Sequence, residues 1–359
     1  MSLLLVLLAL FVLFLMGLVP ALFLTPTAIV VARTANLTAP VRPDRLHREV
    51  RPYGGGLAIA ATLMGWTAAM LILGWEGRHP REPMLLTLAA VPFFMIGLLD
   101  DRYAFQAAPK LGLQFLAAAI AVVGYGIKAT VWLDVPFAGE VVSILWIVVV
   151  VNAYNMLDHA DGLAAAVGIV AMAALGLGQI PWLMEHLMSG PYVLVFAFLT
   201  AGALAGFLIY NFPPAKLFMG DAGTMLVGFL LAALTIQAQY YHEGETPSRL
   251  VVLIPLALLA VPLFDMVCVT LSRIRRRRNP FRGDATSHLA HRMLARGWSP
   301  RGIVAFAAGA AAVTGGASVT MYFLSGPALL LPWLAVAAVL VAMLIVRRPP
   351  PAGITQSSS

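Results

Sequence analysis

Residues 141–163 read VVSILWIVVVVNAYNMLDHADGL, an apolar run that ends in two amides and two carboxylates. The apolar part is typical of a helix inside a lipid bilayer, where a charged side chain costs about 2.5–3.5 kcal/mol on insertion scales. Asn152, Asn155, Asp158 and Asp161 therefore either lie at the membrane surface or serve a purpose that offsets this cost.

The spacing of these four side chains limits how they can meet. Successive members are three residues apart, so each step falls about 60° short of a helical turn and the set spans half of a regular helix. A helix break near Asp158, or a tighter 3₁₀ turn, would bring them together, and Gly162 marks a place for such a turn. One of the two aspartates is expected to cap the next helix. Amides and carboxylates together suit a nucleotide, whose base and ribose need both donors and acceptors.

The whole chain is as apolar as this stretch. Of 359 residues, 61% are apolar and 11% are charged, against about 25% charged in ordinary soluble domains, and the mean hydropathy is +0.89. Its single cysteine excludes an intramolecular disulfide.

Membrane spans need about 20 apolar residues each, and the sequence predicts eleven of them. They are expected near 3–25, 55–75, 83–99, 111–127, 141–157, 162–183, 191–210, 222–241, 250–271, 302–324 and 327–346. The first lacks a preceding basic region and is expected to be retained as a span. We therefore expect an all-α, polytopic integral membrane protein, with one catalytic domain over 1–348 and a disordered tail over 349–359.

Basic residues set the orientation, because cytoplasmic segments carry an excess of Lys and Arg. With the N-terminus outside and the C-terminus in the cytoplasm, only Arg78, Arg81, Lys128 and Arg249 of the 23 Lys and Arg fall on the outer side. This distribution also accounts for the net charge of +7, so no nucleic-acid partner is needed.

The polar clusters all fall on the predicted cytoplasmic side. They occupy 42–60 (RPDRLHREVRPYGGGLAIA), 98–114 (LLDDRYAFQAAPKLGLQ), 152–163, 211–228 (NFPPAKLFMGDAGTMLVG) and 273–294 (RIRRRRNPFRGDATSHLAHRML). Such one-sidedness indicates a single site at the cytoplasmic face.

Three acidic positions suggest a metal ion. Asp100 and Asp101 are adjacent carboxylates at a helix end, which is either a solvated terminus or a cation site. Oxygen ligands suit Mg²⁺, which binds through one or two carboxylates together with phosphate oxygens and water. Asp221 follows Gly220 at a helix start, where the helix dipole alone can stabilise it. Lys216 adds a cation able to meet phosphate.

The last cytoplasmic segment carries two imidazoles. His288 and His291 lie one turn apart, with Arg292 adjacent. This spacing could suit zinc, but no third ligand of the usual kind is expected nearby, so diphosphate recognition is the favoured interpretation. His159 is either a ligand or a loop residue. The arginine run at 273–278 is interpreted as a topology anchor and a contact with anionic lipid.

Several of these stretches together resemble a known family. The chain is similar, over nearly its whole length, to the polyprenyl-phosphate N-acetylhexosamine-1-phosphate transferases of glycosyltransferase family 4. The phospho-N-acetylmuramoyl-pentapeptide transferases are a more distant branch. The matching stretches are HREVRPYGGG, LLDD with Lys110 following, NAYNMLDHADGLA, NFPPAKLFMGDAG, PLFD ending at Asp265, and HLAHR.

The resemblance implies an enzyme of the bacterial inner membrane with its active site on the cytoplasmic face. Such enzymes transfer a sugar-1-phosphate from a UDP-sugar to undecaprenyl phosphate, release UMP and start a cell-envelope glycan. The implied donor is UDP-N-acetylglucosamine or a related UDP-N-acetylhexosamine. The implied cofactor is Mg²⁺, with Mn²⁺ as a substitute. The sequence leaves open whether the enzyme acts as a monomer or a homodimer.

Residue roles follow from the same resemblance. Asp221 would be the main Mg²⁺ ligand, with Asp158 beside it, and Asp100 or Asp101 would meet the lipid phosphate or accept its proton. Asn155, Asp158 and Asp161 would contact the nucleotide and metal region. The implied catalytic residues are Asp100, Asp101, Asp158 and Asp161, and the implied substrate-binding residues are Arg45, His47, Asn152, Asn155, Asn211, Lys216, His288, His291 and Arg292.

Three positions depart from the family pattern. His159 stands where relatives usually have glycine, Ala290 stands where they often have histidine, and Arg45 stands where they often have lysine. Two other functions remain as alternatives. One is transfer of the larger muramyl-pentapeptide phosphate, and the other is a membrane transporter that uses an intramembrane acid such as Asp265.

Overall fold

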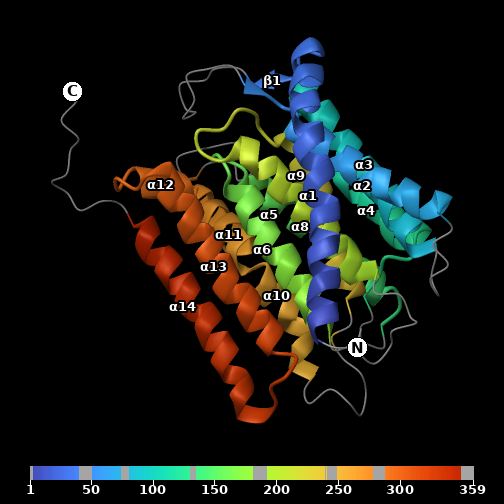
Figure 1. The fold of residues 1–359 in the computed structure, drawn as a ribbon. Coiled ribbons are helices and arrows are strands. Elements are labelled where there is room, and N and C mark those ends of the chain that lie inside the picture. The colour runs from blue at the N-terminus through green and yellow to red at the C-terminus, as the bar shows by residue number, and fades with distance from the viewer. Residues whose placement is uncertain are drawn as a thin grey trace.

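The protein is a bundle of helices in the computed structural model (Figure 1). The structure describes residues 3–39, 51–73, 81–129, 135–180, 192–238, 240, 249–277 and 288–348. Arg45, His47 and the tail at 349–359 lie outside the described residues.

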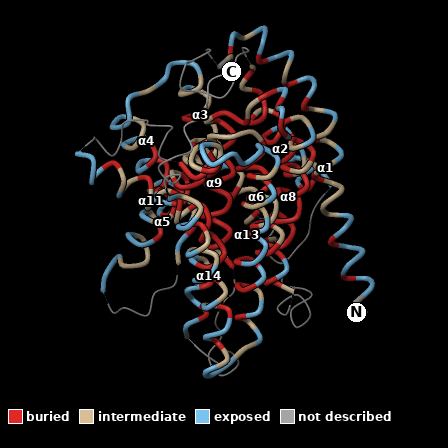
Figure 2. Tube along the Cα trace, turned by 90° about the vertical axis from the view of Figure 1, so that its left-hand side faces the viewer, coloured by how far each residue is buried: buried red, intermediate tan, exposed pale blue. Residues whose placement is uncertain are grey.

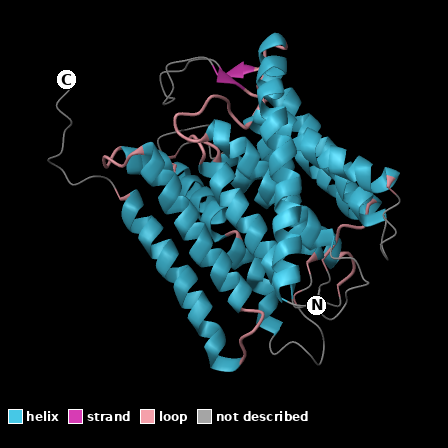
Figure 3. Cartoon of the chain, viewed as in Figure 1, coloured by secondary structure: helices cyan, strands magenta, loops and turns pink. Residues whose placement is uncertain are grey.

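Helices make up nearly all of the described chain (Figure 3). The α-helices are α1 (Leu3–Thr34), α2 (Gly55–Ile72), α3 (Arg81–Tyr103), α4 (Ala107–Ala119), α5 (Ala138–Leu157), α6 (Leu163–Gly178), α8 (Tyr192–Asn211), α9 (Gly220–Gln237), α10 (Ile254–Leu258), α11 (Ala260–Arg275), α12 (Leu289–Leu294), α13 (Pro300–Thr320) and α14 (Leu330–Arg347). Shorter helical turns are η1 (Ile120–Gly124), η2 (Arg249–Leu253) and η4 (Gly326–Leu329). The strands β1 (Thr38–Ala39) and β2 (Arg51–Pro52) form one short antiparallel pair. The predicted all-α membrane fold is confirmed.

The predicted spans correspond to helices one by one. Among the described residues, nine helices are long and apolar enough to cross a bilayer, and the bent pair Leu250–Leu258 and Ala260–Arg275 makes a tenth. The two halves of that pair meet at 71°. The remaining prediction, at 162–183, corresponds to α6, which is apolar but only 16 residues long.

The helices α8 and α9 form the centre of the bundle. In their most apolar windows 78% and 83% of the residues are buried, against 22% in α1 and in α14, which therefore face lipid. Figure 2 shows the same arrangement, with buried residues inside and exposed residues on the outer helices. The helix α9 packs against α2, α3 and α5, so its first residue lies where several helix ends meet.

Small residues allow this close packing, as is usual between helices in membranes. A Cβ atom on Gly97 of α3 would meet the backbone of Asp221 and Ala222 at the start of α9. A Cβ on Gly56 of α2 would lie 2.9 Å from the Cα of Gly223. The position of Asp221 therefore depends on the absence of these two side chains.

The polar segments gather at one end of the bundle. In Figure 1 this end carries β1 and α12, and the N-terminus lies at the other end. Backbone hydrogen bonds join Phe218 to the β2 segment, with Phe218 N donating to Pro52 O at 2.9 Å and Gly55 N donating to Phe218 O at 3.0 Å. The loop before α9 is thereby attached to the loop before α2.

We predict that Gly97→Ala lowers the free energy of unfolding by about 1–3 kcal/mol, the usual cost of overpacking, because the methyl group would push α3 away from the start of α9. The measurement is the thermal unfolding midpoint in detergent. Gly65→Ala is the matched control, since Gly65 lies on the exposed side of α2 and a methyl group there would meet nothing within 4 Å. Equal melting of the two variants would contradict the packing argument.

Candidate active site

Asp101 fixes the start of α9. Its Oδ1 accepts the backbone N–H of Asp221 at 2.7 Å, and its Oδ2 accepts that of Ala222 at 3.0 Å. The first N–H groups of a helix have no partner within the helix, and the residue before α9, Met219, offers no side-chain cap. The carboxylate of Asp101, from the end of α3, therefore supplies the cap from another helix.

Lys110 joins two other carboxylates. Its Nζ lies 2.6 Å from Asp100 Oδ2 and also donates to Asp221 Oδ2. Asp100 Oδ1 accepts the backbone N–H of Phe105 at 2.6 Å, which orients the carboxylate. The ammonium group on the first turn of α4 thus balances two negative charges that would otherwise repel each other.

Asn155 completes the surroundings of Asp221 from the last turn of α5. Its Nδ2 donates to Asp221 Oδ1 at 3.0 Å and to Thr224 Oγ1 at 2.7 Å. The four side chains of Asp100, Lys110, Asn155 and Asp221, called here the Asp221 cluster, come from α3, α4, α5 and α9. The Asp221 side chain is 32% exposed and that of Asp100 is 9% exposed, so Asp221 is the carboxylate open to a ligand.

Asn152 lies one turn deeper in α5 and faces another helix. Its Nδ2 donates to Gln114 Oε1 at 2.7 Å and to Val148 O at 2.8 Å. Gln114 belongs to α4 and is fully buried. In this structure Asn152 connects α5 to α4, whereas Asn155 reaches the Asp221 cluster.

Asp161 and Asn211 fasten two loops to each other. Asp161 Oδ2 accepts the backbone N–H of Ala215 at 2.9 Å and pairs with Arg51 Nη1 at 3.2 Å. Asn211 Oδ1 accepts the N–H of Gly162 at 2.9 Å, and its Nδ2 donates to Leu217 O at 2.9 Å. The loop after α5 is thus attached to the loop before α9.

The start of α6 differs from the sequence-based expectation. The capping position is Gly162, with a φ of +73°, and it makes no side-chain cap. The expectation that an aspartate caps this helix is wrong, because the chain turns through a left-handed glycine instead. The predicted break is present, since α5 ends at Leu157 and Asp158 follows it with non-helical dihedral angles.

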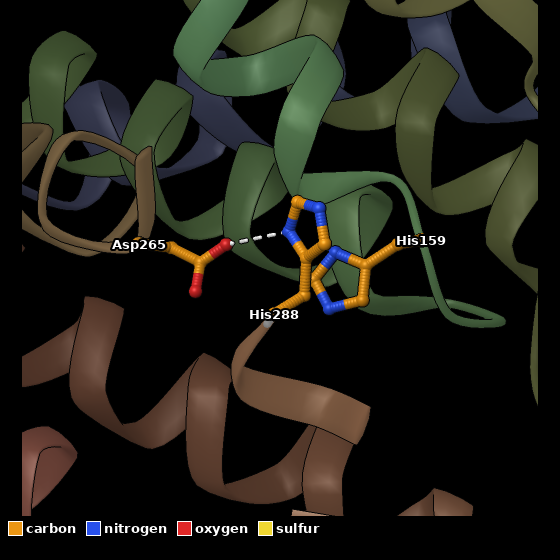
Figure 4. Close-up of side chains that lie close together, drawn as sticks. All are labelled: His159, Asp265 and His288. Atoms are coloured by element: carbon orange, nitrogen blue, oxygen red, sulfur yellow. Dashed lines mark hydrogen bonds and ion pairs between the residues drawn. The ribbon is translucent and has the colours of Figure 1, made fainter. Parts of the chain in front are cut away.

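A second group of side chains, the histidine cluster of His159, Asp265 and His288, lies beside α12 (Figure 4). Asp265 is fully buried in α11, and its Oδ2 lies 3.1 Å from His288 Nδ1. Its Oδ1 accepts the backbone N–H of Leu289 at 3.0 Å and pairs with Arg347 of α14. Each of the three clustered residues offers a ligand atom within 4.8 Å of the others, which meets the distance requirement of a metal site.

His159 lies on the loop after α5 and packs against His288 and the start of α12. Its ring centroid lies 4.2 Å from that of His288 and 5.8 Å from that of His291. Its Nε2 accepts the N–H of Ala290 at 3.3 Å, and its Nδ1 lies 3.0 Å from Met156 O. Removal from water, together with the nearby His288, lowers the pKa of His159 to about 3, so the ring is neutral with its proton on Nδ1. The hydrogen bond from Ala290 to His159 joins two positions that both depart from the family pattern.

The structure places the sequence-predicted residues in distinct surroundings. Asp100, Asn155 and Asp221 are brought together, with Asp101 behind them. Asp158 is half-buried and lies between Asn155 and His159 in the chain. His288 directly precedes α12, and the half-buried His291 and Arg292 lie in it. Lys216 is exposed on the loop before α9.

Sequence reasoning misses several partners of these residues. It identifies Lys110 only as part of a motif. Lys110 lies on the first turn of the helix that follows the two aspartates, and this position marks it as a candidate counter-ion for them. Arg51 and Thr224 lie within recognisable motifs but carry no signal of their own. Arg347 gives no signal at all, because it reads as an anchor at the end of the last span.

We predict that Asp101→Asn lowers the free energy of unfolding by about 1–3 kcal/mol. An asparagine keeps one acceptor oxygen, so its amide group would face one of the two N–H groups at the start of α9. Glu140→Gln is the matched control, because it makes the same exchange of a carboxylate for an amide where the partner, Lys128, is 55% exposed. Thermal unfolding in detergent measures both, and an equal or larger loss in the Glu140 variant would argue against the cap.

Comparison with known proteins agrees with this arrangement. The family model described as "Glycosyl transferase family 4" matches residues 83–239, which include the whole Asp221 cluster. A probable undecaprenyl-phosphate N-acetylglucosaminyl 1-phosphate transferase of Bacillus subtilis is 30% identical, over 80% of this chain and 78% of its own length. A decaprenyl-phosphate N-acetylglucosaminephosphotransferase of Mycobacterium tuberculosis is 32% identical over 78% and 74%. A phospho-N-acetylmuramoyl-pentapeptide-transferase of Lactobacillus johnsonii is 30% identical over 52% and 61%. The chain belongs to glycosyl transferase family 4, among the bacterial membrane enzymes that transfer a sugar phosphate to a polyprenyl phosphate.

Proposed function

We propose that this enzyme transfers N-acetylhexosamine-1-phosphate, with N-acetylglucosamine as the sugar, from a UDP-sugar to undecaprenyl phosphate. It releases UMP and starts a cell-envelope glycan. The observation that carries the proposal is the Asp221 cluster, in which carboxylates, an amide and an ammonium group from four helices meet at one end of the bundle. Such a group of charges suits a diphosphate and its metal ion better than it suits an ion path at the membrane midplane.

Mg²⁺ fits the residues of this cluster. Asp100 and Asp221 both turn carboxylate oxygens toward one cation, the ammonium group of Lys110, so the space between them already accommodates positive charge. Oxygen ligands are the ones that Mg²⁺ prefers. We assign Asp221 as the main ligand because it is the more exposed carboxylate, with Asp158 as the second ligand. When bound, the ion neutralises the charge of the diphosphate and orients it.

The protein itself mainly positions groups and balances charge, as is usual in phosphoryl transfer. In net terms, a phosphate oxygen of the acceptor lipid forms a bond to the β-phosphorus of the UDP-sugar, the bond from that phosphorus to the bridging oxygen breaks, and UMP leaves. Lys110 is placed to contact phosphate oxygens, and Asn155 holds the Asp221 carboxylate. We assign contact with the acceptor phosphate to Asp100, because both oxygens of Asp101 already hold the start of α9.

The branches of the family differ in the sugar donor that they use. The two N-acetylglucosaminyl-phosphate enzymes above match a larger share of this chain than the muramyl-pentapeptide enzyme does, 80% and 78% against 52%. The histidine segment also reads HLAHR without a run of consecutive histidines. Both observations favour a small UDP-N-acetylhexosamine donor.

UMP release from a panel of donors tests the proposal. Purified protein with undecaprenyl phosphate and Mg²⁺ should release UMP from UDP-N-acetylglucosamine or one of its epimers and should give lipid-linked sugar diphosphate. Asp221→Asn keeps the size of the side chain and loses its charge, so we expect at least a hundredfold loss of Mg²⁺-dependent turnover in a protein that still folds, in line with the order of magnitude for one charge-stabilising group. Turnover of the muramyl-pentapeptide donor alone would overturn the assignment.

The active site is proposed to face the cytoplasm of the inner membrane, since 19 of the 23 Lys and Arg lie on that side of the predicted spans. Cysteines introduced at Arg102 and Arg282 in a Cys268→Ser background are expected to be protected from an impermeant thiol reagent in intact cells. A cysteine at Glu243 is expected to react. Labelling of all three positions alike would contradict this orientation.

A further inference from the structure

The histidine cluster contains contacts around His288 that the binding of a substrate would not by itself require. His288 is contacted by Asp265 at its edge and by His159 at its face, and neither of these two residues takes part in the proposed transfer. We propose that Asp265 and His159 are positioning residues that hold the His288 ring in one tautomer, with its proton on Nδ1 and with Nε2 presented to the substrate. Only the identity of the group that Nε2 meets rests on the proposed function.

The hydrogen bonds of Asp265 set the tautomer. Its Oδ1 already receives the N–H of Leu289 and the guanidinium group of Arg347, and its Oδ2 faces His288 Nδ1 at 3.1 Å. An ionised carboxylate accepts hydrogen bonds and donates none. The proton between the two groups must therefore belong to His288 Nδ1, which leaves Nε2 as the nitrogen free to meet a substrate. In Figure 4 this second nitrogen points away from Asp265.

His159 fixes the ring from its other side. Its ring lies 4.2 Å from that of His288 at an interplanar angle of 35°. Its Nε2 accepts the N–H of Ala290 at 3.3 Å, so the first turn of α12, which begins just after His288, is held against the loop after α5. The same loop follows Asn155, which binds Asp221. His288 is thereby held in a defined position relative to the Asp221 cluster.

A metal ion explains the cluster less well than this hydrogen-bonded arrangement does. The charge of Asp265 is already balanced by Arg347, and Asp265 is 0% exposed. His288 Nδ1 carries the proton that a metal would have to replace, and His159 uses both of its ring nitrogens in hydrogen bonds. A cation would have to break several of these contacts to gain three ligands.

The arrangement gives His288 a specific use. With a neutral ring, Nε2 accepts a hydrogen bond from a hydroxyl or amide group. Both groups occur in the diphosphate-linked N-acetylhexosamine that the enzyme is proposed to bind.

Asp265→Asn tests the proposal sharply. Arg347 and the Leu289 N–H both need an acceptor where Oδ1 lies, so the asparagine must keep its oxygen there and turn its NH₂ group toward His288. That NH₂ group donates to Nδ1 and forces the ring proton onto Nε2. The expected result is a reversed tautomer in ¹⁵N NMR spectra of ¹⁵N-histidine-labelled protein in detergent, without substrate. The protein has seven histidines, and the His288 signals are assigned by their loss in His288→Gln.

The kinetic readout separates positioning from stability. We expect kcat in Asp265→Asn to fall by about 10²-fold, the loss typical of one misdirected hydrogen-bonding group, at a much smaller change in KM for the UDP-sugar. His159→Phe keeps a ring against His288 but cannot accept the Ala290 N–H, so we expect the native tautomer with broadened His288 signals and a raised KM.

Three results would overturn the proposal. The first is a wild-type His288 with its proton on Nε2, a measurement that needs no variant to fold. The second is an unchanged tautomer in a folded Asp265→Asn variant. The third is one tightly bound transition metal per chain that is lost in His288→Gln. The wild-type spectrum is independent of turnover, so failure of the donor panel would refute the proposed function and leave the tautomer result standing.

Discussion

The pair of hydrogen bonds from Asp101 to the start of α9 is the interaction on which the rest of the site depends. It places the first turn of a central, buried helix against the end of α3. Asp221 is the first residue whose N–H it holds, so the carboxylate side chain of Asp221 projects from a fixed backbone. Lys110 and Asn155 then reach that carboxylate from two further helices. A half-buried acid whose two oxygens accept backbone N–H groups therefore orients the acid that is open to ligand.

The residues that follow α5 connect this cluster to the second one. Asn155 contacts Asp221, and His159, four residues later, contacts His288 and Ala290. The turn between them is possible because the helix ends at Leu157, and Gly162, with its positive φ, then starts α6. The loop is itself anchored through Asp161 to Arg51 and Ala215. One short loop thus sets the distance between the Asp221 cluster and the histidine cluster.

The sequence alone predicts the fold, because a membrane span is recognised by a long run of apolar residues. Every predicted span corresponds to a helix in the structure, including the short α6. The sequence also predicted that the polar residues at span ends gather at one face, and the structure brings Asp100, Asn155 and Asp221 together there. It could not assign different roles to Asp100 and Asp101. The two residues are adjacent and have the same chemistry, and they differ only in the direction of their side chains and therefore in the partners that they contact. The sequence could not identify Arg347 as part of the histidine cluster's surroundings, because its partner is Asp265, which lies 82 residues earlier in the chain.

The contact between Arg347 and Asp265 has a consequence for how the protein is made. Asp265 enters the bilayer with α11, well before α14 is synthesised, and a buried carboxylate without a counter-charge is costly in a low-dielectric medium. The ion pair forms only when α14 has been inserted and has packed beside α12 and α13. Until then the buried carboxylate of Asp265 receives the N–H of Leu289 but lacks the guanidinium group that balances its charge.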